Sequence, residues 1–464
     1  MMKCVQRPKI IMVPYPAQGH VTPMLKLASA FLKRGLEPVV VTPEFIHRRI
    51  APKLMDQRIS CMSIPDGLEE AGRPRDFFTI EMAMENNMPL HLERLVLELL
   101  GDGQQLIICM VVDLLASWAI NVANRCGVQV AGFWPVMLAA YQLIAAIPHM
   151  LRSGIISQTG HPQYEGPICL PNQPVLSTED LPWLIGTWAA RSSRFKFWRR
   201  TMDRSRSLRW LLVNSFPEEI SLVDESENES ENENENDDKE EDSPPLRILE
   251  VGDLPGAIWS NNGSFWEEDM SCLDWLDKQI GWVVYISFGS WVSSIGEGKV
   301  KSLALALEAS KLPFIWVLPA GTAWRDGLPV GYLERVSVSQ QGKVVSWAPQ
   351  MEVLQHKAVG CYLTHCGWNS TLEAIQCKKP LLCYPLAGDQ FLNCAYIVQV
   401  WRIGVRMTGF GHTDLEEGLK RVMDDCHLIN HRLMALNHRI MGTSSAAANL
   451  TAFIHDLNKF HSTT

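Results

Sequence analysis

The sequence predicts an α/β protein with two parallel sheets, each covered by helices. In the first half, apolar runs at 10–13, 39–41 and 106–112 are separated by segments with helical periodicity. The same alternation resumes in the second half, with short apolar runs at 283–287, 314–317, 343–345, 360–365 and 381–385. The run at 106–112 is apolar throughout, as is typical of a parallel strand covered on both faces. Such alternation, found twice, favours two doubly wound units.

Length and composition narrow the class of protein. A chain of 464 residues with 47% hydrophobic residues favours a folded protein of two or three domains. No window of about 20 uninterrupted apolar residues is present, so we expect no membrane span. The first apolar run is broken by Pro14 and Pro16, which favours a strand over a signal peptide. Twelve cysteines without a secreted-scaffold spacing favour reduced thiols and a cytoplasmic location.

One segment carries most of the charge. Residues 224–242 hold twelve acidic residues and one lysine, so the remainder of the chain is close to neutral. A Glu/Asn repeat cannot bury apolar surface and repels itself, which predicts a solvated, disordered insertion. Docking of a basic partner is the alternative. With a nearly neutral body, we expect no nucleic-acid partner.

The stretch PYPAQGHVTPML, residues 14–25, places His20 directly after the first predicted strand. Thr22 as N-cap and Pro23 as first helical residue predict a helix start, so His20 is expected in the turn before it. Asp113 ends the apolar run at 106–112. Ligands bind beyond the carboxyl ends of parallel strands, so both side chains can line one crevice.

Together the two residues suggest acid–base chemistry. A buried aspartate beside an imidazole can fix its tautomer and stabilise its protonated form. Such a histidine can accept a proton from a hydroxyl near neutral pH. The alternative stays open at this point: His20 caps a turn and Asp113 caps a helix.

A dinucleotide-dependent oxidoreductase would suit the same architecture but lacks its glycine motif. The first strand leads into PYPAQGH rather than G-x-G-x-x-G. GDGQQL at 101 precedes its strand, and GFGHTD at 409 lacks the third glycine. The sequence therefore disfavours this class.

A second candidate site follows the strand at 360–365. Cys366, Gly367, Trp368, Asn369 and Ser370 lead from the strand into a helix, whose first backbone amides form an anion site. The side chains of His365, Asn369 and Ser370 add donors, so a diphosphate fits there without a metal.

Two other interpretations of this stretch exist. Ser370 and Glu373 can form a capping box. Cys361, His365 and Cys366 can bind zinc, although that spacing matches no usual site and lacks a fourth ligand.

Residues 347–390, which begin WAPQ and end GDQ, resemble the box shared by plant secondary-product UDP-glycosyltransferases. The resemblance covers almost the whole chain through the motifs PYPAQGHVTPML, VVDLLASWA, VNSF, CLDWLD, SFGS and SSAAANLTAFI. It implies the GT-B fold, in which two Rossmann-like, doubly wound parallel-sheet domains face a central crevice. The implied domains are an acceptor domain at 1–243, a UDP-sugar domain at 244–440 and a C-terminal helix at 441–464 that packs back on the first domain.

The resemblance also implies a role for each matching residue. In the nucleotide part, Trp347 stacks on uracil, the backbone of Ala348 contacts it, and Gln350 and Glu373 hold the ribose. The diphosphate is held by His365, Gly367, Asn369 and Ser370, with Ser290 of the SFGS loop facing it. The hexose is contacted by Trp368, Asp389 and Gln390, and a glutamine at the last position accompanies glucose more often than galactose. His20 and Asp113 match the catalytic pair of the family.

The chain departs from the family pattern at three places. The family usually carries Gly-Val-Pro where this chain has Lys378, Lys379 and Pro380. A backbone conformation that glycine adopts easily can therefore be lost at Lys378. Pro135 stands where a threonine hydroxyl usually reaches the sugar. The third departure is the insertion at 224–242.

We therefore expect an inverting, metal-independent glucosyltransferase. His20 would take the proton of an acceptor hydroxyl, Asp113 would orient His20, and the product would be a β-glucoside. UDP-glucose is a co-substrate, and no cofactor is expected. The partners are the UDP-sugar and a small lipophilic acceptor, and we expect a monomer without integral membrane contact.

Three alternatives accompany this expectation. The chain can be a UDP-sugar-binding pseudoenzyme, or it can use another UDP-hexose. The basic and aromatic stretch at 194–210 can lie on an anionic membrane surface. The acceptor cannot be read from the sequence, which offers only apolar candidates: Phe77, Phe78, Trp183 and Trp188.

Overall fold

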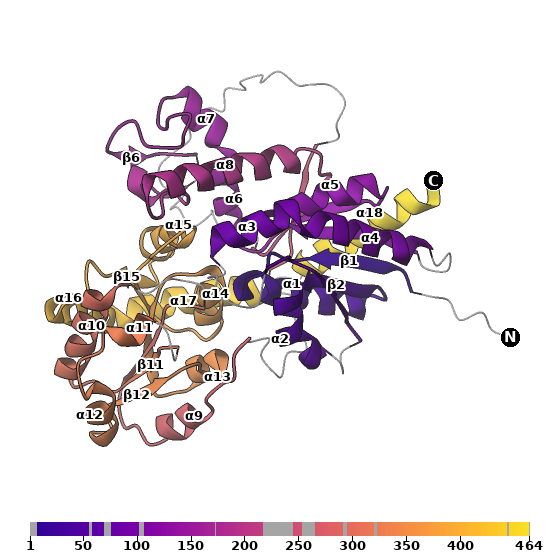
Figure 1. The fold of residues 1–464 in the computed structure, drawn as a ribbon. Coiled ribbons are helices and arrows are strands. Elements are labelled where there is room, and N and C mark those ends of the chain that lie inside the picture. Colours follow the sequence, from indigo (N-terminus) through magenta and orange to yellow (C-terminus); the bar gives the residue numbers. More distant parts are fainter. Residues whose placement is uncertain are drawn as a thin grey trace. The chain divides into compact units, whose positions relative to one another are not determined.

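The computed structural model describes residues 7–54, 58–68, 76–101, 106–171, 173–216, 245–252, 265–290, 295–319, 323–442 and 445–463. The chain forms two compact units, each built on its own parallel sheet (Figure 1). This confirms the predicted α/β class. The acidic segment 224–242 lies outside the described residues.

Unit 1 comprises Met1–Ala145, Phe197–Phe265 and Ser444–Thr464. Its described strands pair in parallel in the order β3-β2-β1-β4-β5-β8-β9. The strands are β1 (Lys9–Val13), β2 (Glu37–Pro43), β3 (Ser60–Ile64), β4 (Ile107–Asp113), β5 (Val130–Trp134), β8 (Trp210–Val213) and β9 (Arg247–Glu250). The helices are α1 (Gln18–Lys33), α2 (Glu44–Leu54), α3 (Phe77–Asn86), α4 (Met88–Gly101), η2 (Leu114–Ala116), α5 (Trp118–Arg125), α6 (Leu138–Ala145) and α18 (Ser445–Thr463).

Unit 2 comprises Ala146–Lys196 and Trp266–Thr443. Its main sheet is parallel, in the order β12-β11-β10-β13-β14-β15. The strands are β10 (Val283–Ser287), β11 (Phe314–Val317), β12 (Gly342–Val345), β13 (Val359–Thr364), β14 (Leu381–Cys383) and β15 (Gly404–Arg406), with a small antiparallel pair β6 (Pro167–Ile168) and β7 (Leu176–Ser177). The helices are α7 (Ile147–Arg152), η3 (Thr178–Asp180), α9 (Ser271–Leu276), α10 (Glu297–Ser310), α11 (Ala323–Asp326), α12 (Tyr332–Val338), α13 (Gln350–Gln355), α14 (Trp368–Gln376), α15 (Gln390–Ala395), the π-helical turn η4 (Tyr396–Val400), α16 (His412–Asp424) and α17 (Cys426–Gly442). Helix α8 (Trp188–Ser205) runs from unit 2 into unit 1.

The division differs from the expected boundary at 243. Residues Ala146–Lys196 group with the C-terminal half because they contact it directly: Asp180 pairs with Arg406 at 3.8 Å, and Gln399 donates to the carbonyl of Val175. The C-terminal helix α18 belongs to unit 1, where Leu450, Phe453 and Leu457 are buried in the core cluster.

Strand order brings the predicted site residues to two sheet edges. In unit 1, β1 and β4 are neighbours, and Val13 is level with Val112, so their carboxyl ends meet. In unit 2, β10 and β13 are neighbours, and Ser287 is level with Thr364. His20 follows β1 and Asp113 ends β4, whereas the SFGS motif begins at the last residue of β10 and the HCGW motif follows β13.

Candidate active site

His20 and Asp113 form a direct contact in unit 1. The Nδ1 of His20 lies 2.8 Å from Oδ2 of Asp113, whose side chain is fully buried. The His20 side chain is 17% exposed. A carboxylate at this distance orients the imidazole and leaves Nε2 as the ring nitrogen that Asp113 does not engage.

The Asp113 carboxylate also accepts hydrogen bonds from two backbone N–H groups. Its Oδ2 accepts from the backbone N–H of Tyr15 at 3.2 Å, and its Oδ1 accepts from that of Leu115 at 3.0 Å, which caps η2. These donors compensate the buried charge. Asp113 therefore caps a helix and orients His20, so the two interpretations of this residue are compatible.

The predicted helix start at Thr22 and Pro23 is wrong. Helix α1 begins at Gln18 with Ala17 as N-cap, which places His20 in its first turn and Pro23 inside it. The carbonyl of Ala17 accepts the N–H groups of His20 and Val21, so the chain turns into the helix without a side-chain cap. The base candidate is thus fixed by regular helical backbone rather than by a turn.

His365 occupies a narrow slot in unit 2. A Cβ added at Gly289 would lie 2.6 Å from its Nε2, and one at Gly367 would lie 2.4 Å from it, so only glycine leaves room for the ring on either side. Burial lowers the pKa of His365 to about 4. The ring is therefore neutral at pH 7. Within the described residues, its Nδ1 has no hydrogen-bond partner.

The predicted anion site after His365 coincides with the start of a helix. Helix α14 begins at Trp368, with Gly367 as an N-cap that offers no side-chain bond to the first amides. Ser370 and Glu373 do not form the capping box considered above, because Ser370 lies inside the first turn. The proposed zinc ligands Cys361, His365 and Cys366 form no ligand cluster in the described part of the chain.

The residues predicted to hold the ribose form a closed network. Gln350 donates from Nε2 to Oε2 of Glu373 at 2.6 Å and to Oγ of Ser370 at 3.2 Å. Its Oε1 accepts from the hydroxyls of Tyr285 and Tyr362 at 3.0 and 3.2 Å. Sequence reasoning missed the two tyrosines, although each interrupts an apolar strand with a hydroxyl. They are register partners on β10 and β13.

The predicted uracil residues precede α13. Trp347 is half-buried, and its ring lies 6.0 Å from that of Trp266, a residue the sequence did not single out. The backbone is fixed here too, since the carbonyl of Trp347 accepts from Asp269 N–H at 3.0 Å. Ala348 is buried.

The predicted hexose contacts surround the start of α15. The Oε1 of Gln390 accepts from the N–H groups of Leu386 and Ala387, both at 2.9 Å, which orients its Nε2 away from them. Asp389 accepts from Asn393 at 2.8 Å. Trp368 is 2% exposed and its ring packs near that of Trp401, so its side chain is part of the core.

Ser290 and Pro135 lie in different units. Ser290 is half-buried after β10 in unit 2. Pro135 follows β5 in unit 1, and its carbonyl accepts from Asn214 at 2.9 Å. Pro135 supplies no hydroxyl, as the sequence indicated.

The two lysines that depart from the family motif have different environments. Lys378 has φ of +55°, so it adopts the left-handed conformation that glycine would take more easily. Lys379 donates from Nζ to the carbonyls of Val359 and His356 at 2.7 and 3.1 Å. Lys378 therefore has the left-handed backbone conformation that glycine adopts most easily.

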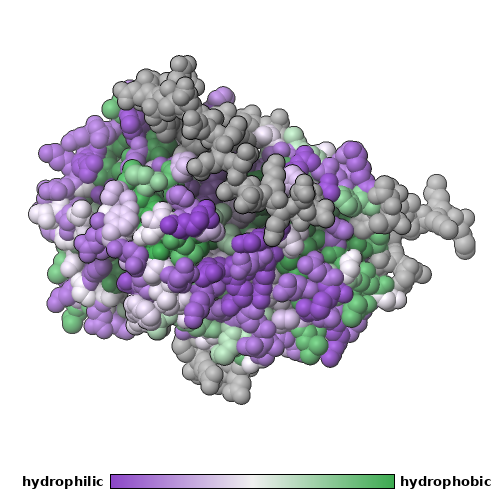
Figure 2. All heavy atoms as spheres, turned by 90° about the horizontal axis from the view of Figure 1, so that it is seen from above, coloured by the Kyte–Doolittle hydropathy of each residue, from purple (hydrophilic) through white to green (hydrophobic). Residues whose placement is uncertain are grey.

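The stretch at 194–210 offers no apolar face to a membrane. Phe195 and Phe197 are buried. Arg200 and Arg204 pair with Glu81 and Glu85 of α3. Among the described residues, no helix has the length and apolarity to cross a membrane. Figure 2 shows hydrophilic and hydrophobic residues intermixed on the face in view.

The acceptor candidates have different environments. Phe77 packs edge-on against Phe78 and Phe197 in unit 1. Trp183 is fully buried in unit 2 and donates from Nε1 to the carbonyl of Gly160, so it is a core residue. Trp188 is 65% exposed, and its ring stacks on His161 with a 4.8 Å centroid separation.

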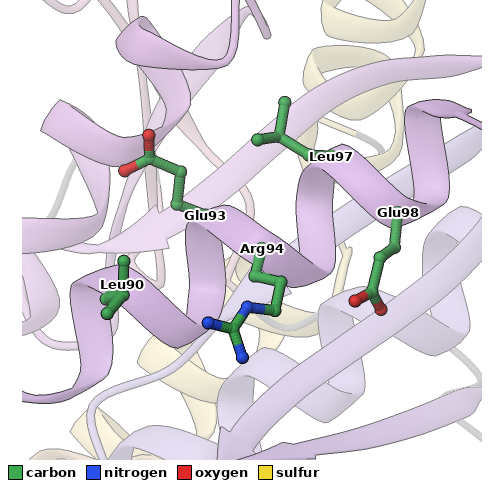
Figure 3. Close-up of a pocket in the computed structure, with 5 residues that line it drawn as sticks. All are labelled: Leu90, Glu93, Arg94, Leu97 and Glu98. Atoms are coloured by element: carbon green, nitrogen blue, oxygen red, sulfur yellow. The ribbon is translucent and has the colours of Figure 1, made fainter.

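A shallow pocket of about 460 Å³ lies elsewhere, on the outer side of α4 (Figure 3). Its walls contain none of the predicted site residues. They are formed by Leu90, Glu93, Arg94, Leu97 and Glu98.

Comparison with known proteins places this chain in a family. Residues 277–439 match the family model of UDP-glucoronosyl and UDP-glucosyl transferase. UDP-glycosyltransferase 82A1 of Arabidopsis thaliana is 54% identical over 98% of this chain and 100% of its own length.

Two solved structures have the same fold over nearly the whole chain. A UDP-glucosyltransferase from Polygonum tinctorium, in complex with 3,4-dichloroaniline, has a TM-score of 0.78 and 22% identity over 98% of this chain and 99% of its own. UGT71G1 of Medicago truncatula, complexed with UDP-glucose, has a TM-score of 0.77 and 22% identity over 98% and 100% of the two chains. These similarities confirm the predicted GT-B fold.

Proposed function

Because the chain belongs to the plant UDP-glycosyltransferases, we propose that it transfers glucose from UDP-glucose to a hydroxyl of a small lipophilic acceptor, with inversion at the anomeric carbon. The observation that carries the proposal is the 2.8 Å contact between His20 Nδ1 and Asp113 Oδ2. It leaves an oriented imidazole at the start of α1 and a buried carboxylate to stabilise its protonated form.

In the proposed reaction, His20 Nε2 takes the proton of the acceptor hydroxyl. The acceptor oxygen attacks the anomeric carbon from the side opposite the diphosphate, and the bond from that carbon to the diphosphate oxygen breaks. This single displacement from the opposite face turns an α-linked donor into a β-glucoside. Asp113 stabilises the imidazolium that forms.

The leaving diphosphate is proposed to bind at the start of α14. The first backbone amides of α14, which lack a side-chain cap, can donate to phosphate oxygens. His365 contributes as a neutral donor from Nε2, since burial keeps it uncharged. The negative charge that develops on UDP is thus stabilised by fixed hydrogen-bond donors. The proposed reaction needs neither a metal nor another cofactor.

Two observations favour glucose as the sugar. The Gln390 amide is fixed through Oε1, which leaves its Nε2 to donate to a sugar hydroxyl. UGT71G1, which has the same fold, is described in complex with UDP-glucose. We extend the donor to this chain on that basis. The proposed roles of Trp347, Ala348, Gln350, Glu373 and Asp389 rest on the family motif in the sequence.

The test is product analysis with purified protein, UDP-glucose and a panel of phenolic acceptors, in buffer containing a metal chelator. We expect UDP release and a glucoside whose anomeric proton has the large coupling constant of a β-linkage. UDP binding without release for any acceptor would favour the pseudoenzyme. An α-glucoside would contradict the inverting mechanism.

A further inference from the structure

Three cysteine thiols meet in unit 2 although they lie far apart in the sequence. Cys366 follows β13, Cys383 ends β14, and Cys394 lies in α15. Their sulfur atoms all lie within 4.8 Å of one another. β13 and β14 are adjacent, with Thr364 level with Cys383, so the strand ends and the helix after them enclose the cluster.

The cluster is buried and has three potential ligands. The exposed fractions of Cys366, Cys383 and Cys394 are 0%, 0% and 1%. Buried free cysteines often serve only as small apolar side chains. Here, however, three sulfur donors lie within 4.8 Å of one another, and among the described residues no fourth ligating side chain joins them. A structural zinc site needs four ligands, so this set suits a three-coordinate soft ion instead.

The thiols also interact with one another. Hydrogen bonds from the Cys366 and Cys383 thiols, helped by the charge of Arg406, hold the pKa of Cys394 below its usual value. Burial raises the pKa of Cys366 and of Cys383.

The net charge of three thiolates with a bound ion distinguishes among the soft ions that the cluster can bind. Three thiolates carry three negative charges, so a monovalent or divalent cation would leave a net charge in a buried site, which is costly. Trivalent arsenic bound to three thiolates is neutral. It is also three-coordinate, which matches the number of sulfur atoms in the cluster.

We propose that Cys366, Cys383 and Cys394 form a binding site for trivalent arsenic taken up as arsenite. Arsenous acid, As(OH)₃, reacts with three thiols to give one tris-thiolate arsenic and three water molecules. Three As–O bonds are replaced by three As–S bonds, and each thiol proton leaves with a hydroxide as water. Arsenic stays in the +3 state, so no oxidant or reductant is needed.

The site also couples to the donor site of the proposed function. Cys366 stands between His365 and Gly367, and Cys394 lies on α15, which begins at Gln390. The Nδ2 of Asn393 donates to the carbonyl of Cys366 at 2.9 Å, so α15 and the HCGW turn are already tied together. Closing three sulfurs onto one atom would draw these elements together and weaken UDP binding.

The binding test uses the full chain, reduced and then incubated with excess sodium arsenite before native mass spectrometry. We expect one arsenic per folded chain. Cys383→Ala and Cys394→Ala should each lose at least about 100-fold in arsenite affinity, because each removes one of three linked attachments. Cys361→Ala removes an equally buried thiol on β13 and should bind arsenic as the parent does.

Peptide mapping gives a second readout that does not depend on variants. Arsenite should protect Cys366, Cys383 and Cys394 of the native parent from slow alkylation and leave Cys361 unprotected. No bound arsenic, equal affinity in all variants, or protection of Cys361 alone would overturn the site. Zinc(II) binding that depends on the three cysteines, with no arsenite binding, would overturn the assignment to arsenic.

Calorimetric titration with UDP tests the coupling, which rests on the proposed donor site. Arsenite should weaken UDP binding to the parent at least about 10-fold, the size of a common allosteric coupling, and should have no such effect on Cys394→Ala. Unchanged UDP affinity with arsenic bound would overturn the coupling. Arsenic binding itself is read without turnover, so its failure is distinguishable from failure of the proposed transferase reaction.

Discussion

Gln350 donates a 2.6 Å hydrogen bond to the Glu373 carboxylate while the Tyr285 and Tyr362 hydroxyls hold its carbonyl oxygen. Gln350 therefore orients Glu373, and we expect much of its effect on nucleotide binding to pass through that residue.

Gln350→Ala should weaken UDP binding about 10-fold, because it removes a hydrogen bond to a charged group worth about 1.5–3 kcal/mol. Tyr362→Phe, which removes only one of two hydroxyls, should have a smaller effect. In a Glu373→Ala background, Gln350→Ala should add less than about 2-fold, since coupled residues are not additive. Calorimetric UDP titrations of the parent, the three single variants and the double variant measure this, and full additivity of Gln350→Ala and Glu373→Ala would show that Gln350 acts independently.

Lys378 carries a conformational penalty that glycine would remove. Its φ of +55° disfavours a side chain by about 1–2 kcal/mol, part of which is offset by the greater entropy of glycine in the unfolded chain. Lys378→Gly should therefore raise the unfolding free energy by up to about 1 kcal/mol. Lys378→Ala keeps the conformational penalty and removes the long side chain, so it should not raise the unfolding free energy. Equal stabilisation by both changes in urea titrations would disprove the backbone explanation.

His365 should make stability depend on pH. Its folded pKa of about 4 lies below the value near 6.5 of an unfolded histidine, so the unfolded chain binds the proton first as the pH falls. The contribution of neutral His365 to the free energy of unfolding is complete above about pH 6.5. It is lost between about pH 6.5 and 4, by up to about 3 kcal/mol.

His365→Gln, which does not titrate, isolates this effect. Between pH 7 and 4.5, the unfolding free energy of the parent should fall more than that of the variant. Parallel loss in the two proteins would mean that the histidine titrates normally in the folded state.

Gln390 should decide how well the hexose is held. Gln390→Glu keeps an oxygen for the Leu386 and Ala387 amides but replaces the donor amide with a carboxylate. We expect kcat/KM for UDP-glucose to fall about 10- to 100-fold, as for loss of a good hydrogen bond at 1.5–3 kcal/mol, while the Kd for UDP stays unchanged. Parent-like turnover of UDP-glucose by this variant would remove Gln390 from the sugar site.

The parent should prefer UDP-glucose to UDP-galactose and UDP-glucuronic acid. The glutamine at the closing position motivates the first preference, and the second rests on the absence of an arginine in the sequence placed to pair a uronate. Comparable kcat/KM values for UDP-glucuronic acid would contradict it.

Much of this structure could be predicted because it depends on short-range pattern. The apolar runs became parallel strands, and polar residues at their carboxyl ends, such as His20 with Asp113 and His365, lie where that topology places them. The start of α1 could not be predicted, because Ala17 caps it through its backbone alone. A side chain gave no signal there, and Thr22 gave a misleading one.

The features missed by sequence reasoning depend on strand register and long-range packing. Tyr285 and Tyr362 meet only because β10 and β13 are paired in one register, which periodicity does not specify. The cysteine cluster likewise joins residues from three elements. The burial of Trp183 and of the Trp368 ring depends on neighbours from distant segments.

Asp113→Asn should lower turnover without abolishing UDP binding. The amide keeps the shape of the side chain, but it cannot stabilise an imidazolium and can favour the wrong tautomer of His20. We expect kcat to fall and the Kd for UDP to stay within about 2-fold, because the residues proposed to bind UDP lie in unit 2. An unchanged kcat would leave Asp113 with only its capping role at η2.

The most direct test of the account is kcat/KM of the parent and of His20→Ala over acceptors of graded acidity, from aliphatic alcohols to acidic phenols and thiols. If His20 is the base, the variant should melt like the parent and lose about 10²–10⁴-fold with alcohols, the usual effect of a positioned base. The loss should shrink steadily as the acceptor ionises more easily. A His20→Ala protein that melts normally yet glucosylates alcohols at the parent rate, or loses the same factor with every acceptor, would contradict the mechanism.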